Sequence, residues 1–339
     1  MLDRQEKPSP LLTTIKNTPE LSIFYSLFSN TGGTSGIPGP ALEERFNDPN
    51  NCLQFNAFAP TNNAFENVSQ ETMQTLQRPQ SYQLLYHILI NHIAPGTPTF
   101  SDLQEQGAVH TIGGFDISFD AQGTLLTNAN TTSEPERSAN HQATLVKGQD
   151  GQPTRIPASN GAIFMIDHVL DGLYTYFGVD EPAPDDQKQR PDPIEHSGTM
   201  RDIIDSTPEL STLKETLHNL GADFPSRLSL TSSDMQVNNR TVYLAPSNDA
   251  FDILPSAATE KALQPSNYDL SAFLLRFGMG EVEGSNREAG TMKVKSDTGF
   301  DIMVEGSRAN NARVEKRVCA ENGCVWVVSR WLDPLWKLF

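Results

Sequence analysis

The sequence repeats itself at long range, and this repeat constrains the fold more than any other feature. Residues 18–22 read Thr-Pro-Glu-Leu-Ser, and the same five residues occur again at 207–211, displaced by 189 positions. Nearly the same displacement relates Ala-Pro-Thr-Asn-Asn-Ala-Phe at 59–65 to Ala-Pro-Ser-Asn-Asp-Ala-Phe at 245–251. Blocks that recur in register indicate one structural unit present twice. We therefore expect two copies of one domain.

Two further blocks complete the repeat and reveal an insertion. Phe-Asp-Ile at 115–117 matches 300–302 at a similar displacement. The Asn-Gly block at 160–166 matches 322–328 at a displacement of only 162. The first copy must therefore hold about 23 additional residues, and we assign them to a polar surface loop within 130–157.

Proline and acidic residues mark the boundary between the copies. Residues 179–193 contain four prolines and an excess of acid, and they offer little apolar surface to bury. We predict domains at residues 10–174 and 199–337, joined by a linker over 175–198. A length of 339 residues suits two domains, because domains cluster near ~100–150 residues.

Charge and hydropathy exclude two classes of partner. The chain has 42 acidic and 25 basic residues, a net charge of −17 and a pI of about 4.8. Proteins that bind nucleic acid neutralise phosphates with Lys and Arg, so we expect no nucleic-acid partner. Apolar runs stop at five residues or fewer, whereas a bilayer span needs about 20. We expect no membrane span, and the charged first residues show no signal peptide.

Apolar spacing predicts the order of elements in each copy. Apolar residues recur at mostly three- and four-residue intervals over 11–28 and over 200–220, which indicates amphipathic helices. Short apolar runs at 55–59 and 241–245 end at proline and are typical of strands. Each copy then closes with a β-hairpin around an Asn-Gly pair. We predict α+β domains with a largely antiparallel β-core.

A second helix is expected directly after each of these strands. Thr61 and Ser247 are placed to accept a hydrogen bond from the first amides of that helix. Phe65 and Phe251, four residues later, then fall on its buried side.

The ordered motifs resemble the fasciclin-like domain family, here present twice. They are Ala-Pro-Thr/Ser-Asn-x-Ala-Phe, a central Tyr-His pair in the first copy only, and the closing Asn-Gly hairpin. The resemblance implies two tandem domains, each a twisted, wedge-shaped β-sandwich with packed helices. It also implies a mostly extracellular family that works in adhesion and matrix binding without a shared catalytic site. Some fungal members are associated with secreted oxidases, and the chain is similar to a fungal-type member.

The resemblance also singles out partner-binding candidates. Tyr86 and His87 match the family's Tyr-His pair, and Ala272-Phe273 stand in their place in the second copy. The pair either satisfies backbone groups from a half-buried position or contacts a partner. Asp167 and His168 suggest an acid-base pair, but neighbours on a strand point to opposite faces. Because Arg330 replaces His168 in the second copy, we predict a cationic surface contact there.

Cysteines and sequons bear on the compartment. Cys319 and Cys324 flank the second hairpin turn, a placement that would let their side chains face each other across the strands, whereas Cys52 has no evident partner. We expect a Cys319–Cys324 disulfide in an oxidising lumen and two reduced thiols in the cytosol. Sequons at Asn67, Asn130 and Asn239 are candidate glycosylation sites, but about three are expected by chance.

Three functional hypotheses follow, of which the first two need no catalytic site and a standalone enzyme is the third and least favoured. The sequence contains no His-Glu-x-x-His, Gly-x-Ser-x-Gly or phosphate-loop motif, so we assign no catalytic residue, metal or cofactor. The first hypothesis is a non-enzymatic, extracellular-type binding or adhesion protein with a protein, matrix or cell-surface ligand. It implies, by resemblance, a secreted or endomembrane-lumen location. The alternative is an accessory protein that assists a secreted multicopper oxidase in coupling phenolic or polyketide intermediates, holding an aromatic small molecule during pigment or secondary-metabolite biosynthesis.

Overall fold

The structure is a computed structural model, and it forms two compact units. One comprises residues 1–174 with 337–339, and the other residues 175–336; each is described by itself. The described residues are 8–29, 42–48, 52–66, 68–114, 116–120, 124–127, 142–170, 189–220, 226–230, 241–254, 268–286 and 291–336. Residues 175–188 of the expected linker and residues 130–141 of the expected 130–157 loop lie outside them. The described part of that loop is not loop throughout, because residues 142–144 and 155–158 form strands.

Each unit begins with helices that proline divides. The expected helix over 11–28 is three segments, α1 (Leu11–Lys16), η1 (Pro19–Leu21) and α2 (Ser22–Ser29). Pro19 has no amide hydrogen and holds Thr18 in an extended conformation, so the first helix ends before it. The second copy breaks in the same way at Pro208, giving α9 (Met200–Ser206), η5 (Pro208–Leu210) and α10 (Ser211–Leu220).

The first unit contains two four-stranded sheets. One has the order β2-β1-β8-β7 and the other β3-β4-β5-β6. A buried cluster that includes Phe58, Ile117 and Phe164 draws its residues from both sheets, as expected of a sandwich. The strands are β1 (Phe55–Pro60), β2 (Ile93–Pro95), β3 (Ala108–His110), β4 (Asp116–Phe119), β5 (Thr124–Thr127), β6 (Gln142–Thr144), β7 (Arg155–Ala158) and β8 (Gly161–Ile166).

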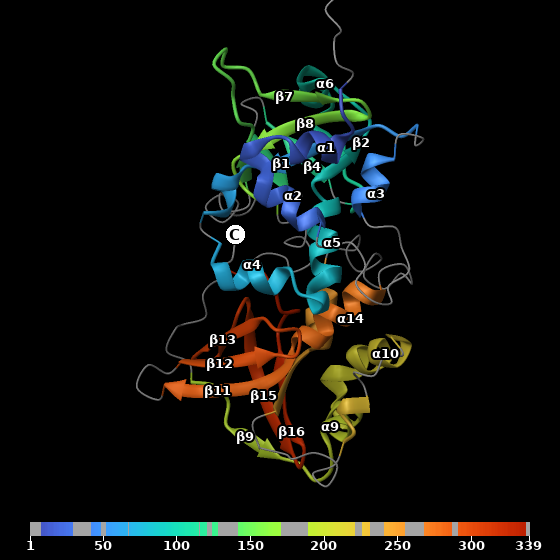
Figure 1. The fold of residues 1–339 in the computed structure, drawn as a ribbon. Helices are drawn as coiled ribbons and strands as arrows, with labels where there is room; N and C mark the ends of the chain where they lie inside the picture. The colour runs from blue at the N-terminus through green and yellow to red at the C-terminus, as the bar shows by residue number, and fades with distance from the viewer. Residues whose placement is uncertain are drawn as a thin grey trace, which may run out of the picture. The chain divides into compact units, whose positions relative to one another are not determined.

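Helices cover this unit beside the β1–β8 pair (Figure 1). The remaining elements are α3 (Leu42–Asn47), η2 (Asn62–Phe65), α4 (Gln70–Leu76), η3 (Pro79–Ser81), α5 (Tyr82–Ile90) and α6 (Phe100–Gln106). β1 and β8 run parallel to each other, although the sequence predicts a largely antiparallel core. They lie side by side because the chain between them makes a long crossover through the other strands and helices.

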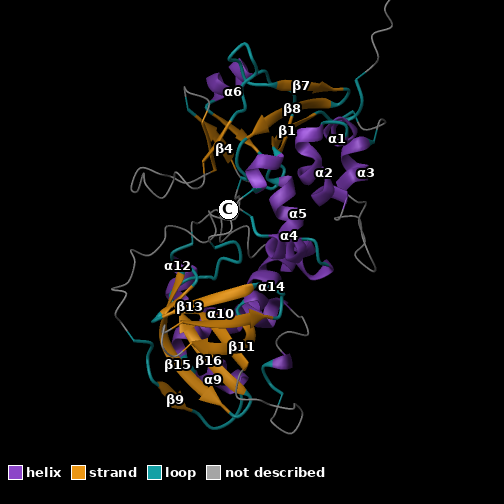
Figure 2. Cartoon of the chain, turned by 60° about the vertical axis from the view of Figure 1, so that its left-hand side comes forward, coloured by secondary structure: helices purple, strands orange, loops and turns teal. Residues whose placement is uncertain are grey.

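In the second unit one sheet closes on itself. Its order is β14-β13-β12-β11-β10-β16-β15-β9, and an additional β14–β15 pairing joins distant strands, so the sheet is strongly curved (Figure 2). Its central pair, β10 and β16, is again parallel. The strands are β9 (Pro193–Glu195), β10 (Thr241–Pro246), β11 (Met279–Asn286), β12 (Thr291–Ser296), β13 (Asp301–Glu305), β14 (Arg308–Ala309), β15 (Ala312–Ala320) and β16 (Gly323–Val328), and the remaining helices are α12 (Asn248–Asp252) and α14 (Tyr268–Phe277).

The repeated motifs contact one another. In the first unit the amide group of Asn62 donates to the Pro19 carbonyl at 3.0 Å, and its oxygen accepts from the Ile23 amide at 3.0 Å. In the second, Asn248 binds the Pro208 carbonyl and the Thr212 amide at the same distances. The Asn of one motif therefore holds the helix start of the other, which explains why both motifs recur together.

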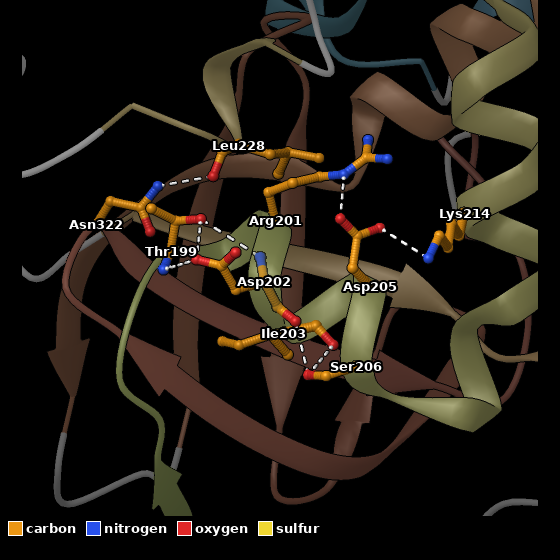
Figure 3. A network of polar contacts seen from close by, with 9 residues as sticks. All are labelled: Thr199, Arg201, Asp202, Ile203, Asp205, Ser206, Lys214, Leu228 and Asn322. Carbon is orange, nitrogen blue, oxygen red and sulfur yellow. Dashed lines mark hydrogen bonds and ion pairs between the residues drawn. The ribbon is translucent and has the colours of Figure 1, made fainter.

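The Asn-Gly hairpins form a second pair of clamps. Asn160 accepts from the Leu11 amide at 2.7 Å, and Asn322 accepts from the Met200 amide at 2.7 Å. Asn322 also donates to the Leu228 carbonyl at 2.9 Å (Figure 3). In the same view Thr199 caps α9. The hairpin turn and the first helix of each unit are thus fixed to each other.

The expected helix caps occur in one copy only. The Ser247 hydroxyl accepts from the Ala250 amide at 3.3 Å, as predicted. Thr61 makes no side-chain cap, so that prediction is wrong. The segment after Thr61 is a short 3₁₀ turn rather than an α-helix. Phe65 and Phe251 are both buried, as expected.

The end of the expected linker is structured. β9, which lies within the predicted linker, pairs in parallel with β15. Arg317 of β15 also donates to the Pro191 carbonyl at 3.2 Å. An exposed strand this short escapes periodicity analysis because its three residues are all solvent-exposed.

Candidate functional site

The candidate site of the first unit is built around α5, which carries the predicted Tyr86-His87 pair. Tyr82 and Tyr86 lie one turn apart and stack with ring centroids 6.0 Å apart. Tyr86 also meets the His87 ring edge-on at 5.5 Å. Burial, followed by the proximity of Tyr86, raises the pKa of Tyr82. Both tyrosines are half-buried, so they combine apolar area with polar tips.

His87 points into the unit. Its exposed fraction is 8%, and burial lowers its pKa to about 4. Among the described residues its Nδ1 has no hydrogen-bond partner. Nδ1 therefore makes no hydrogen bond to a backbone group of the described residues. Tyr86 rather than His87 is the member of the pair that can reach a partner.

His92 is the histidine that sequence reasoning missed. It is fully buried, its Nδ1 lies 2.8 Å from the Ile88 carbonyl, and its Nε2 accepts from the Leu170 amide at 2.9 Å. Nδ1 must therefore carry the proton. Burial lowers its pKa to about 4, partly opposed by the Ile88 carbonyl. The signal in the sequence was a lone histidine directly before an apolar strand, where a buried ring needs backbone partners.

His92 forms one wall of an apolar pocket. The pocket lies at the carboxyl end of β1, and Phe24, Pro60, Ile88 and Val169 also line it. Its cavity volume is about 10 Å³, enough for about one water molecule. The second unit has a pocket at the matching place. Pro246 lies there where the first unit has Pro60, and Trp331 where it has Val169. Gly278 takes the place of His92. The location is a property of the fold, and the histidine is particular to the first unit.

Comparison with known proteins identifies the first unit. Residues 19–172 match the family model of the fasciclin domain. Over these residues the first unit is similar to the fasciclin domain. Fasciclin domains are associated with cell adhesion and binding, and the family is usually extracellular or secreted. The second unit repeats its parallel central strand pair, its asparagine clamps and its closing hairpin, so the two fasciclin-like domains stand in tandem.

Individual relatives are distant. Protein sll1483 of the Synechocystis strain ATCC 27184 is 30% identical over 117 residues, which cover 34% of this chain and 54% of that protein. The chain thus spans about half the length of that curated relative. A solved fasciclin domain pair from the insect cell adhesion molecule fasciclin I is 13% identical over 97% of each chain, with a TM-score of 0.29.

His168 and Asp167 are closer than predicted. The expectation that they point to opposite faces is wrong, because β8 ends at Ile166 and the chain bends there. His168 Nδ1 lies 2.9 Å from Asp167 Oδ1. The same oxygen accepts a hydrogen bond from the Thr144 amide at 2.6 Å. At the equivalent place in the second domain, the Ser329 hydroxyl accepts from the backbone amide of Arg313. Asp167 is therefore a structural acceptor, and the exposed His168 ring remains a candidate contact.

The remaining candidates from the sequence are the cysteines and the three sequon asparagines. Cys319 and Cys324 face each other between β15 and β16 and form a disulfide, with Cα atoms 4.0 Å apart, while Cys52 is exposed and free. Asn67, Asn130 and Asn239 lie outside the described residues.

Metal clusters and membrane-spanning helices are both missing from the described part of the chain. No group of three or more His, Cys, Asp or Glu residues there could hold a metal ion. No helix there is long and apolar enough to cross a membrane.

Proposed function

We propose that this protein is a non-enzymatic, extracellular-type adhesion protein whose first fasciclin domain binds a protein or matrix ligand through α5. The stacked Tyr82–Tyr86 pair carries the proposal. Tyrosine supplies rigid amphipathic contact area and is enriched at interfaces. The polar residues of the repeated motifs, in contrast, are engaged in holding the fold together. His168 is a second candidate contact on the same domain.

Replacing Tyr86 with alanine is expected to weaken ligand binding by the full chain about 30-fold, the effect of losing an interface anchor of ~2 kcal/mol. Biosensor surfaces coated with collagen, with fibronectin or with cell-wall polysaccharide measure it. Tyr25→Ala is the matched control, because Tyr25 is also half-buried but lies on α2. Absence of binding to every surface, or equal binding by Tyr86→Ala and wild type, would contradict the proposal.

The alternative, an accessory role beside an oxidase, needs a different kind of site. It requires a site for an aromatic small molecule, and such pockets usually measure about 300–1,000 Å³. The apolar pocket beside His92 has a cavity volume of about 10 Å³, far below that range. Adding the full chain to a copper oxidase with a phenolic substrate tests it directly. We expect unchanged coupling products, and altered products would favour the alternative.

An oxidising location predicts a specific thiol pattern. Protein purified from its native source should show one labelled cysteine, Cys52, when thiols are alkylated before unfolding and mapped by mass spectrometry. Labelling after reduction should reveal Cys319 and Cys324 as well. Three labelled cysteines without reduction would mean that the bond is absent in the native compartment and would remove this support for secretion.

A further inference from the structure

Two arginines meet at the edge of the second domain's sheet. β9 pairs with β15 so that Pro193 lies opposite Arg317. Arg190, three residues before Pro193, is thereby placed beside the same part of β15. The Arg317 guanidinium donates to the carbonyl of Pro191, the residue after Arg190, at 3.2 Å. Both side chains are half-buried.

The pair lies toward the inner face of the curled sheet. Side chains directly opposite in register share a face, and Arg317 is opposite Trp326, which is itself opposite Leu244. Following the register through β11 and β12 places Met292 on this face too, opposite the buried Val304. Arg190 therefore reaches over the inner face to Met292 from the β9 edge.

The two guanidinium groups have poor partners. Arg190 Nη1 donates to the Met292 sulfur at 2.7 Å, and a thioether is a weak acceptor. Arg317 lies over the Trp326 ring at 4.8 Å from its centroid. The buried Arg317 Nε and the Trp326 indole N–H have no hydrogen-bond partner among the described residues. Several N–H donors at this edge thus lack strong acceptors.

Neither arginine is paired with a carboxylate of the residues that the structure describes. Within the described ranges, no Asp or Glu lies at ion-pair distance from Arg190 or Arg317. Burial, and then repulsion from Arg190, lowers the pKa of Arg317, while the exposed Asp192 opposes the effect. Partly buried charges are normally paired. A pair of like charges that only the exposed Asp192 offsets is all the more unexpected in a chain with a net charge of −17.

We propose that Arg190 and Arg317 form a binding site for a tetrahedral oxyanion, sulfate or phosphate, at the β9 edge of the second domain. This site is independent of α5 and of the proposed adhesion surface. A guanidinium group presents several N–H donors in a fork that matches the oxygens of such an anion. One dianion bridging both arginines would neutralise their mutual repulsion and supply the missing acceptors. The neighbouring indole ring would keep one side of the site apolar.

Titration calorimetry of the full chain tests the site with sodium sulfate and sodium phosphate, against sodium chloride at equal ionic strength. We expect saturable binding of one anion per chain with a Kd of about 1 mM or tighter. Binding should also change the emission of Trp326, which underlies Arg317. No saturable heat up to about 20 mM of either anion would overturn the proposal.

Charge-removing variants locate the site. Arg190→Gln should weaken anion binding about 10- to 100-fold, as expected for a lost charge-assisted hydrogen bond. Arg190 precedes β9 and belongs to no strand, so we expect the sheet to form in this variant. Arg313→Gln is the control, because it removes the same charge from the same sheet at a residue that contacts Glu315. Equal loss in both variants, or full binding by Arg190→Gln, would refute the assignment.

A second set of ligands distinguishes a free anion from an ester. Glucose 6-sulfate and glucose 6-phosphate are titrated beside the inorganic ions. Binding of an ester at least as tight as that of its ion, and lost in Arg190→Gln, would identify the site as one for a substituted sugar or similar ligand. Binding of the inorganic ions alone would identify a closed site for the free anion. Each outcome supports the oxyanion site and assigns its source.

Discussion

Gly161→Ala is expected to prevent folding of the first fasciclin-like domain. Gly161 starts β8 directly opposite Phe55 of β1. A β-carbon there would lie 1.9 Å from the Phe55 carbonyl oxygen and 2.9 Å from its carbon. Both are backbone atoms of the central strand pair, so the clash can be relieved only by separating β1 from β8. We expect a loss above about 4 kcal/mol, which few single substitutions reach.

Gly151→Ala is the matched control for this prediction. Gly151 has a φ of +75°, but a β-carbon there would have no atom within 4 Å. Alanine at this position costs only the left-handed backbone penalty of about 1–2 kcal/mol. Hydrogen exchange of the peptides covering β1 and β8 measures both variants. Tryptophan emission provides an internal reference, because Trp326, Trp331 and Trp336 are the chain's three tryptophans and all lie in the second domain. Protection of β1 in Gly161→Ala equal to that in the control would show the clash to be harmless.

The duplication and the coarse element order were readable from the sequence because they depend on local patterns. Phe65 and Phe251 were placed correctly, since each follows a strand and a proline at a fixed distance. The division of the first helices is also a local effect, because Pro19 and Pro208 restrict the backbone of the residue before them. The tandem fasciclin-like architecture likewise followed from motifs that contact each other in the folded chain.

What the sequence left open depends on contacts between distant residues. The parallel pairing of β1 with β8 joins segments more than 100 positions apart, and no periodicity encodes it. The sequence alone does not show whether His87 and His92 are exposed or buried. Only the fold shows that His92 accepts a hydrogen bond from the Leu170 amide. The pairing of Arg190 with Arg317 is likewise invisible, because it depends on three exposed residues adding to a sheet edge.

Acidification is expected to destabilise the first domain through its two buried histidines. An unfolded histidine has a pKa near 6.5, whereas burial lowers the pKa of His87 and of His92 to about 4 in the folded domain. Between these values the unfolded chain binds protons that the folded domain does not. Stability is therefore fully present above pH 6.5 and falls as the pH drops toward 4. The loss from pH 7 to pH 5 amounts to about 2 kcal/mol per histidine.

The two histidines differ in what protonation would break. A proton on His92 Nε2 would face the Leu170 amide hydrogen and convert the acceptor into a second donor, releasing the segment after β8. A proton on His87 would create a charge among apolar side chains, since its ring has no acceptor at Nδ1 within the described structure. Aspartate side chains that cap helices, such as Asp102 with its lowered pKa, lose stabilisation only in more acidic solution. Measurements between pH 7 and 5 therefore isolate the histidines.

The second copy supplies the variant that tests this account. Phe273 occupies the position of His87 in the second fasciclin-like domain, so His87→Phe places there a residue that the fold already tolerates. Urea unfolding of the full chain, followed by hydrogen exchange of α5 and β1, should show a loss of about 4 kcal/mol in wild type from pH 7 to pH 5, and about half of that in His87→Phe. His92 then accounts for the remainder. An identical pH slope in the two proteins would mean that His87 takes up its proton without leaving the core.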